Sequence, residues 1–150
     1  MAKSFAASVA AFGEKTKVRM GHVFKEAVQD VIDEAQMTKA KGGRMPVKDG
    51  FLRNSLVGGI GAGDFQVRQP ARMGDPGALD GSYEVTIESM TIGDVARFAW
   101  TAAYAMRMEM GFAGTDKLGR TYEQPGNFFV GSAAAKWQTF VDKQAAKVKD

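Results

Sequence analysis

The chain has no cysteine and only one histidine, His22, among its 150 residues. Without cysteine it forms no disulfide, thiolate zinc site or iron–sulfur cluster, and it has no cysteine nucleophile. A single histidine excludes a metal site built from several histidines, and a Ser-His-Asp triad would have to use His22. These absences remove many catalytic and metal-binding classes, and we expect no cofactor and no enzymatic activity.

Long apolar runs are absent as well. No segment approaches the roughly 18 to 20 apolar residues of a membrane-spanning helix, so we expect no membrane partner. Residues 1–12 are rich in alanine and phenylalanine, but serines interrupt the run. Lys15, Lys17 and Arg19 lie where the cleavage region of a signal peptide would be. We therefore interpret this stretch as the first turns of a helix.

Neither sign of charge is in large excess. The chain has 20 basic and 17 acidic side chains, a formal charge of +3 that is well short of a nucleic-acid-binding composition. Hydrophobic residues at 45% and charged residues at 25% are typical of globular proteins. The length is enough for one core, so we predict a single domain over residues 1–150.

The first predicted element is a long helix over residues 4–37. Ser4 is a suitable N-cap, and residues 38–44 hold the lysines and glycines that commonly end a helix. Gly13 and Gly21 predict a bend or break, because glycine disfavours a helix interior. Apolar positions recur at steps of three and four, which predicts a face turned to the core. They are Phe5, Val9, Phe12, Thr16, Met20, Phe24, Ala27, Val31 and Ala35.

Residues 46–100 are predicted to be rich in β-structure. Short strands are expected at residues 55–57, 65–68, 83–88 and 95–100. Residues 83–88 alternate strictly between apolar and polar side chains, the pattern of a strand exposed on one face. We interpret the glycine-rich residues 58–64 as a flexible connection, because no helix follows as a nucleotide-binding loop requires. Residues 69–82 form a long loop, and such loops are usually functional or mobile.

The C-terminal part returns to helical periodicity. Asn127 is the predicted cap of a helix whose apolar face includes Phe129, Trp137 and Phe140. The predicted fold class is α+β: a long N-terminal helix, a small and mostly antiparallel sheet, and a C-terminal helix packed on the sheet.

Charged clusters have a chemical and a structural interpretation, and we favour the structural one in each case. Acidic residues of the first helix could bind a cation or act as paired carboxylates, or form an exposed face; they are Glu26, Asp30, Asp33 and Glu34. Basic residues after that helix could contact DNA phosphates or form a solvated linker; they are Lys39, Lys41, Arg44, Lys48 and Arg53. Glu84 and Glu88 could serve a hydrolase or form the wet face of a strand.

Three segments resemble the tail-completion proteins of long-tailed bacteriophages, also called neck or minor tail proteins. Residues 45–56, MPVKDGFLRNSL, resemble the family pattern Pro-Val-Asp-Thr-Gly-x-Leu-Arg-x-Ser. Residues 103–112, AYAMRMEMGF, resemble Tyr-Ala-x-x-x-Glu-x-Gly, and residues 124–129, QPGNFF, resemble the Pro-x-Pro-Phe ending before an alanine-rich helix. Two features depart from the family pattern: Lys48 before Asp49, and Gly126-Asn127 in place of the second proline.

The motif residues are expected to support the fold rather than to catalyse a reaction. Asp49 can cap a short turn from which Leu52 packs inward, and Gly111 lies where a helix ends on a positive φ. Pro46 keeps its predecessor extended. The resemblance implies scaffold roles for Pro46, Asp49, Gly50, Leu52, Arg53, Ser55, Tyr104, Ala105, Glu109, Gly111, Phe128 and Phe129.

The resemblance implies a virion structural protein at the phage head–tail junction, assembled in the host cytoplasm. Copies would form a homo-oligomeric ring, expected to be hexameric, between the connector or stopper and the tail terminator or tail tube. DNA would at most pass through the lumen. Candidate interface residues, in the 69–82 loop and around 112–122, are Met73, Leu79, Phe112 and Tyr122.

Two other classes stay open at this point. A small basic DNA-binding accessory protein is the alternative, on the basis of a pI of about 9.2 and the basic cluster at 39–53. A hydrolase that uses Glu84, Glu88 or the helix carboxylates is the third.

Overall fold

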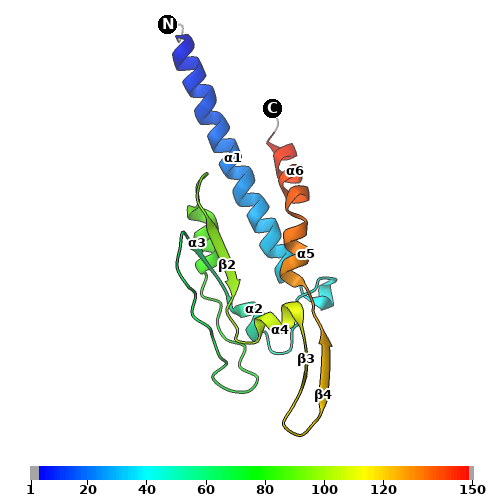
Figure 1. Ribbon diagram of the computed structural model, residues 1–150. Coiled ribbons are helices and arrows are strands. Elements are labelled where there is room, and N and C mark those ends of the chain that lie inside the picture. Colours follow the sequence, from blue (N-terminus) through cyan, green and yellow to red (C-terminus); the bar gives the residue numbers. More distant parts are fainter. Residues whose placement is uncertain (1–3, 149–150) are drawn as a thin grey trace.

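An elongated body carries one projecting element at each end (Figure 1). This computed structural model describes residues 4–148. Helix α1 (Phe5–Gln36) runs along the molecule, and its first turns extend beyond every other helix. A β-hairpin projects at the opposite end. The overall class is α+β, as predicted, with two small antiparallel sheets in place of one.

Helix α1 begins where the sequence predicts. The Ser4 side chain accepts a hydrogen bond from the Ala7 backbone N–H at 3.1 Å. The helix continues through Gly13 and Gly21, so the expected bend or break is wrong. After Met37, a 3₁₀ turn (Lys39–Lys41) and Gly42, at φ 87°, reverse the chain.

The first sheet pairs strands from the two ends of the middle region. β1 (Leu56–Ile60) runs antiparallel to β2 (Ala96–Trp100), with Leu56 opposite Trp100. The predicted strand at 65–68 does not form, and Arg68 makes only an isolated bridge to Ala102. Residues 61–81 are instead one long connection without a helix or strand.

Residues 83–88 form a helix, and the predicted strand is wrong. α3 (Ser82–Ser89) starts after Gly81, which has φ 74°. It lies so close to β1 that a Cβ built on Gly58 would be 2.8 Å from the Tyr83 Cα. The glycines at 58 and 59 therefore belong to a strand that lets a helix approach its backbone, not to a flexible connection. Tyr83 and Ile87, four residues apart, pack inward.

Two short helices lie within the first two motif segments, and a β-hairpin connects the second segment to the third. α2 (Phe51–Asn54) precedes β1, and α4 (Ala105–Met110) follows β2. β3 (Gly111–Thr115) and β4 (Thr121–Pro125) pair antiparallel to form the projecting hairpin. The sequence patterns predicted no strand here, only a candidate contact region around residues 112–122.

The C-terminal helix is divided at Lys136 into α5 (Phe129–Ala135) and α6 (Trp137–Lys147). Both pack along α1. The ring of Phe129 also meets Trp100 of β2 edge-on, at a centroid distance of 5.5 Å. The predicted Asn127 cap is wrong, because Phe128 is the N-cap residue and the Asn127 side chain donates to the Met108 carbonyl.

Two buried clusters fill the body. One joins α1, β1, α3 and the segment after it through Ile32, Leu56, Ile87 and Met90. The other is built around Phe129, and Trp100 packs against both. Only the lower half of α1 contributes to them, so the predicted core-facing stripe is wrong for its first half.

Candidate functional site

The three motif segments meet in the cluster around Phe129. Phe129 is 1% exposed and lies among Met45, Phe51, Leu52 and Ala102. Tyr104, Ala105 and Met108, from the second segment, pack against the same cluster. Segments that are far apart in the sequence thus form one structural unit at the base of α1.

The first segment behaves as its residues predict. The Asp49 carboxylate accepts from the Phe51 backbone N–H at 3.0 Å, and Gly50 has φ 93°. Leu52 is buried. Ser55 precedes β1 rather than beginning it, and its buried hydroxyl donates to the Leu52 carbonyl.

The same segment is tied to the end of α1. Arg53 Nε donates to the Gln36 carbonyl at 3.1 Å, and Gln36 Nε2 donates to the Arg53 carbonyl at 3.0 Å. The Gln36 side chain also accepts from Trp100 Nε1 at 2.9 Å. Pro46 follows Met45, which pairs with Thr38 in a bridge, consistent with the expected extended backbone.

The carboxylate of Glu109, in the second segment, joins this segment to the third. Glu109 Oε2 accepts from the Val130 backbone N–H at 3.0 Å, and Oε1 accepts from that of Gly131 at 2.8 Å. These are N–H groups of the first turn of α5, which an acidic side chain stabilises. Glu109 therefore fixes the start of α5 to the end of α4.

Close backbone contact explains the glycines at this joint. Gly111 has φ 87°, and a Cβ built there would lie 2.6 Å from the Gln124 carbonyl oxygen. A Cβ on Gly126 would lie 2.4 Å from the Glu109 carbonyl oxygen. Phe128 is the one described non-glycine residue with positive φ, at 51°. The base of the hairpin is thus held by backbone geometry that larger residues would disturb.

The predicted interface residues fall into two separate groups. Met73 is 97% exposed and Leu79 is also exposed, both in the 61–81 connection. Phe112 and Tyr122 lie on the hairpin, where Tyr122 is 43% exposed and the Arg107 guanidinium covers the Phe112 ring at 4.7 Å. The structure does not bring the two groups into one site; they lie in different parts of the molecule (Figure 1).

The connection at 69–82 is ordered by an aspartate. Asp75 accepts from the Gly77 and Ala71 backbone N–H groups, both at 2.9 Å. These two bonds, the Gly77 bond most, hold the pKa of the Asp75 carboxyl below its ordinary value. The Asn54 side chain donates to the Pro76 carbonyl at 3.0 Å and anchors the connection to α2.

The tip of the hairpin is organised in the same way by Asp116. Its carboxylate accepts from the backbone N–H groups of Arg120 and Leu118, each at 2.9 Å. It also accepts from the Arg120 guanidinium and from the Tyr122 hydroxyl. The Arg120 N–H contributes most to holding the Asp116 pKa below its ordinary value. The hydrogen bond from the Tyr122 hydroxyl to Asp116 raises the pKa of Tyr122.

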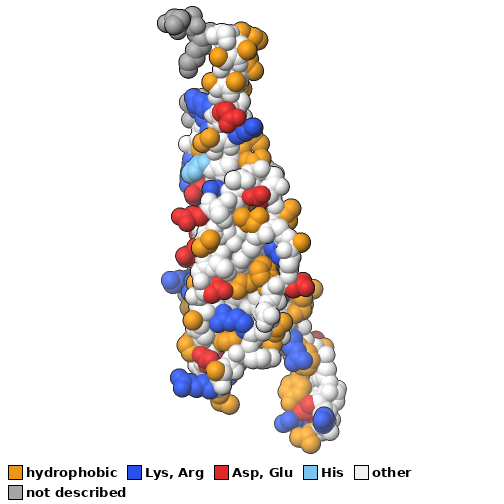
Figure 2. All heavy atoms as spheres, turned by 90° about the vertical axis from the view of Figure 1, so that its left-hand side faces the viewer, with side chains coloured by type: hydrophobic (Ala, Val, Ile, Leu, Met, Phe, Trp, Pro, Cys, Tyr) orange, Lys and Arg blue, Asp and Glu red, His pale blue; other side chains and the backbone are white. Residues whose placement is uncertain are grey.

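Within residues 4–148, no helix or strand covers the apolar face of the upper half of α1, residues 5–20. Phe5 is 86% exposed and Phe12 is 71% exposed, and Val9 and Met20 are also exposed. Hydrophobic side chains stand on the surface of this narrow end in Figure 2. The periodicity of this segment predicted an apolar face correctly, but the sequence could not show that no element of the same chain covers it.

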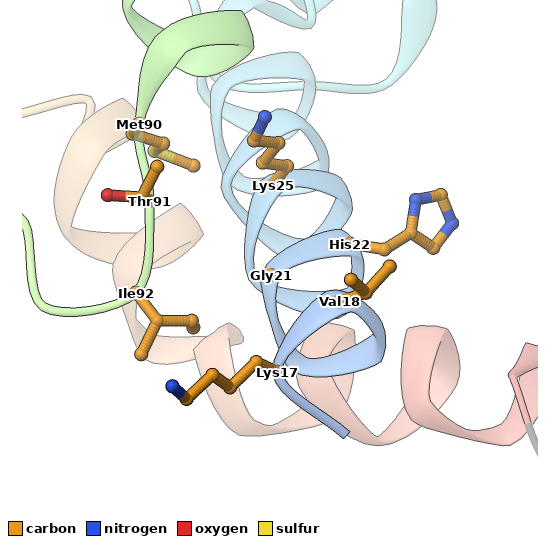
Figure 3. Close-up of a pocket in the computed structure, with 8 residues that line it drawn as sticks. All are labelled: Lys17, Val18, Gly21, His22, Lys25, Met90, Thr91 and Ile92. Carbon is orange, nitrogen blue, oxygen red and sulfur yellow. The ribbon is translucent and has the colours of Figure 1, made fainter. Parts of the chain in front are cut away.

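A shallow hollow of about 550 Å³ lies between α1 and the segment after α3. Met90 and Ile92 line one side, and Lys17 and Lys25 of α1 line the other (Figure 3). The His22 ring points away from the hollow. No carboxylate lines the hollow, so it lacks the ligands that hard cations prefer.

The charged clusters take largely structural roles. Asp30 accepts from Gln144 Nε2 at 2.6 Å and pairs with Lys143 at 3.3 Å, while Glu34 pairs with Lys136. The acidic stripe is thus partly engaged with the C-terminal helices.

The basic cluster and the α3 carboxylates show the same tendency. Arg44 donates to the Asn127 carbonyl at 3.4 Å, and Arg53 binds the end of α1. Glu84 and Glu88 lie exposed on α3, where Glu84 accepts from the Tyr83 hydroxyl at 3.0 Å. Figure 2 shows both signs of charge interspersed over the visible face.

Comparisons add little to this picture. Among residues 4–148, no three His, Cys, Asp or Glu side chains are placed to hold a metal ion. None of the helices in this described part of the chain is long and apolar enough to cross a membrane. No family model, curated protein or solved structure matches the chain.

Proposed function

We propose that this chain is a virion structural protein at the head–tail junction of a long-tailed bacteriophage. It would form a ring that completes the tail or joins it to the head connector. The supporting observation is the meeting of the three family-like segments in the single cluster around Phe129. Residues that act together in one structural unit make a stronger resemblance than three unrelated short matches.

The shape suits a ring subunit. In a closed ring each subunit presents two different surfaces to its neighbours and two further faces to the proteins above and below. The 61–81 connection and the β3–β4 hairpin are separate projections that could serve such contacts. The proposed neighbours are the connector or stopper on one side and the tail terminator or tail tube on the other.

Deletion of the gene from its phage, followed by electron microscopy of the lysate, tests this proposal. We expect DNA-filled heads and separate or defective tails, with infectivity restored by the wild-type gene supplied in trans. Supplying the double variant Phe112→Ala and Tyr122→Ala should restore far less than Glu123→Ala, a change on the same hairpin. Normal infectious particles after deletion would contradict the proposal.

The DNA-binding alternative has its own measurement. Since Arg44 and Arg53 make contacts within the chain, three lysines of the basic cluster are left to meet phosphates. We expect no salt-sensitive gel shift with duplex DNA at physiological ionic strength. A clear shift that is lost on changing Lys39, Lys41 and Lys48 to alanine would favour DNA binding over assembly.

A further inference from the structure

One face of α1 is covered over its lower half and bare over its upper half. Steps of three and four residues connect Phe5, Val9, Phe12, Thr16, Met20, Val23, Ala27, Asp30 and Glu34 along this face. At its lower end, Asp30 and Glu34 contact side chains of the C-terminal helices, and Ala27 is fully buried. α6 ends well short of the upper end of α1 (Figure 1). The bare part is thus the continuation of an existing helix–helix contact.

The length, apolar area and charge of the bare part, residues 5–20, define which kind of partner can cover it. Residues 5–20 span about 24 Å as a helix, the length of one further helix of about 16 residues. Its exposed Phe5, Val9, Phe12 and Met20 present on the order of 500 Å² of apolar surface, near the upper limit for a typical monomer. Residues 4–13 carry no charged side chain. The occupant should therefore be an apolar helix face of similar length.

A second copy of the same segment meets these requirements. In an antiparallel pair, the uncharged first turns of one α1 lie beside Lys15, Lys17 and Arg19 of the other. A parallel pair would instead bring the two cationic ends together, which is unfavourable. We propose that the upper halves of α1 from two copies, residues 5–20, pack antiparallel on their bare faces. Covering both bare faces would bury on the order of 1,000 Å² in total, about the least that a specific protein–protein interface needs.

The pairing does not rest on the proposed function. A cyclic ring is closed by two different surfaces of each subunit, whereas this contact uses the same surface twice. The two proposals can therefore fail separately.

The first test is the molar mass of the full chain in solution, measured by light scattering after size exclusion. We expect twice the mass of one chain for the wild type. Phe12→Glu should raise the dissociation constant at least about tenfold, because pairing would bury a carboxylate. Val18→Glu is the matched control: Val18 is 71% exposed but lies off the bare face, beside the hollow, and its change should leave the pair intact.

The possible outcomes distinguish which partner covers the bare face of α1. A monomeric wild type overturns the pairing and leaves the face to a different protein. A hexamer that Phe12→Glu leaves intact overturns the pairing while supporting the ring. If Phe12→Glu and Val18→Glu both abolish assembly, the antiparallel pairing is also overturned. That result would indicate that the bare face of one copy packs into the hollow of the next.

A second test uses the absence of cysteine from the chain, since every disulfide formed then comes from an introduced residue. Phe12→Cys lies near the centre of an antiparallel pair of residues 5–20 and should cross-link two chains on mild oxidation. Thr16→Cys is offset from its counterpart by about 10 Å along the helices in that arrangement and should not cross-link. Cross-linking through residue 16 but not through residue 12 would overturn the antiparallel arrangement.

Discussion

The packed body and the two projecting ends of this molecule are built from similar residues but stabilised in different ways. In the body, Phe129 and Leu56 are buried among side chains from many segments. At the upper end, Phe5 and Phe12 follow the same helical periodicity in water. The hairpin at the other end has exposed side chains along all of β4. Periodicity therefore predicts the helix and its apolar face, whereas burial depends on what the rest of the chain places there.

The largest expected effect is at the centre of the body. Phe129→Ala removes a ring from a site with 1% exposure and should lower the free energy of unfolding by about 3 to 5 kcal/mol. Phe128→Ala is the matched control, because its neighbouring side chain is exposed and it should lower stability by less than about 1 kcal/mol. Urea denaturation followed by circular dichroism measures both. Equal losses would contradict the assignment of Phe129 to the core.

The contrast between packed and exposed aromatic side chains can also be tested within α1 itself. Phe24 meets Trp137 of α6 edge-on at a centroid distance of 6.0 Å, while Phe12, 71% exposed, has no aromatic ring partner within residues 4–148. Phe24→Ala should lower the unfolding free energy by about 2 kcal/mol, and Phe12→Ala by less than about 0.5 kcal/mol. Both are measured at low protein concentration, so that association of chains does not add to stability. A large loss from Phe12→Ala in a monomer would show that the chain covers this ring.

The joint between body and hairpin should be intermediate. Glu109→Ala leaves the Val130 and Gly131 N–H groups without their acceptor and should lower stability by about 1 to 2 kcal/mol. Glu123→Ala, an exposed carboxylate on β4, is the control with no expected loss. Thermal unfolding compares the two, and a neutral Glu109→Ala would show that Glu109 does not hold α5.

Sequence patterns predicted the parts of the fold that depend on local chemistry. Ser4 and Asp49 cap the turns that their side chains favour, and β2 forms in the segment that holds the aromatic residues Phe98 and Trp100. The alternation over residues 83–88 was misleading, because Tyr83 and Ile87 satisfy a helical spacing as well as an alternating one. Only the close approach of α3 to Gly58 decides between them, and that is a tertiary contact.

The candidate site shows the same division between residues that a local pattern marks and contacts that only the fold reveals. The resemblance selected Glu109, yet its partners at residues 130 and 131 could not be found without the fold. The hairpin had a local signal that was overlooked: Asp116 and Gly119, three residues apart, are favoured at the first and last positions of a turn. Met73 and Tyr122 lie on exposed segments, but nothing local indicated that the two segments lie apart.

The smallest expected effect is at the hairpin tip, which is organised by hydrogen bonds to the Asp116 carboxylate rather than by buried side chains. Because the pKa of Asp116 is lowered on folding, its stabilisation is fully present above the ordinary value of 3.8 and is lost as the pH falls through the lowered value. Amide exchange at Leu118 and Arg120, whose N–H groups bind this carboxylate, should therefore approach the rate of a pH-matched unfolded reference increasingly below about pH 4. The core amides should stay protected at the same pH. Asp116→Asn removes the ionisable group and should remove the pH dependence of amide exchange at the tip. If the variant kept this pH dependence, another group would be responsible for it, and Asp116 would not be what organises the tip.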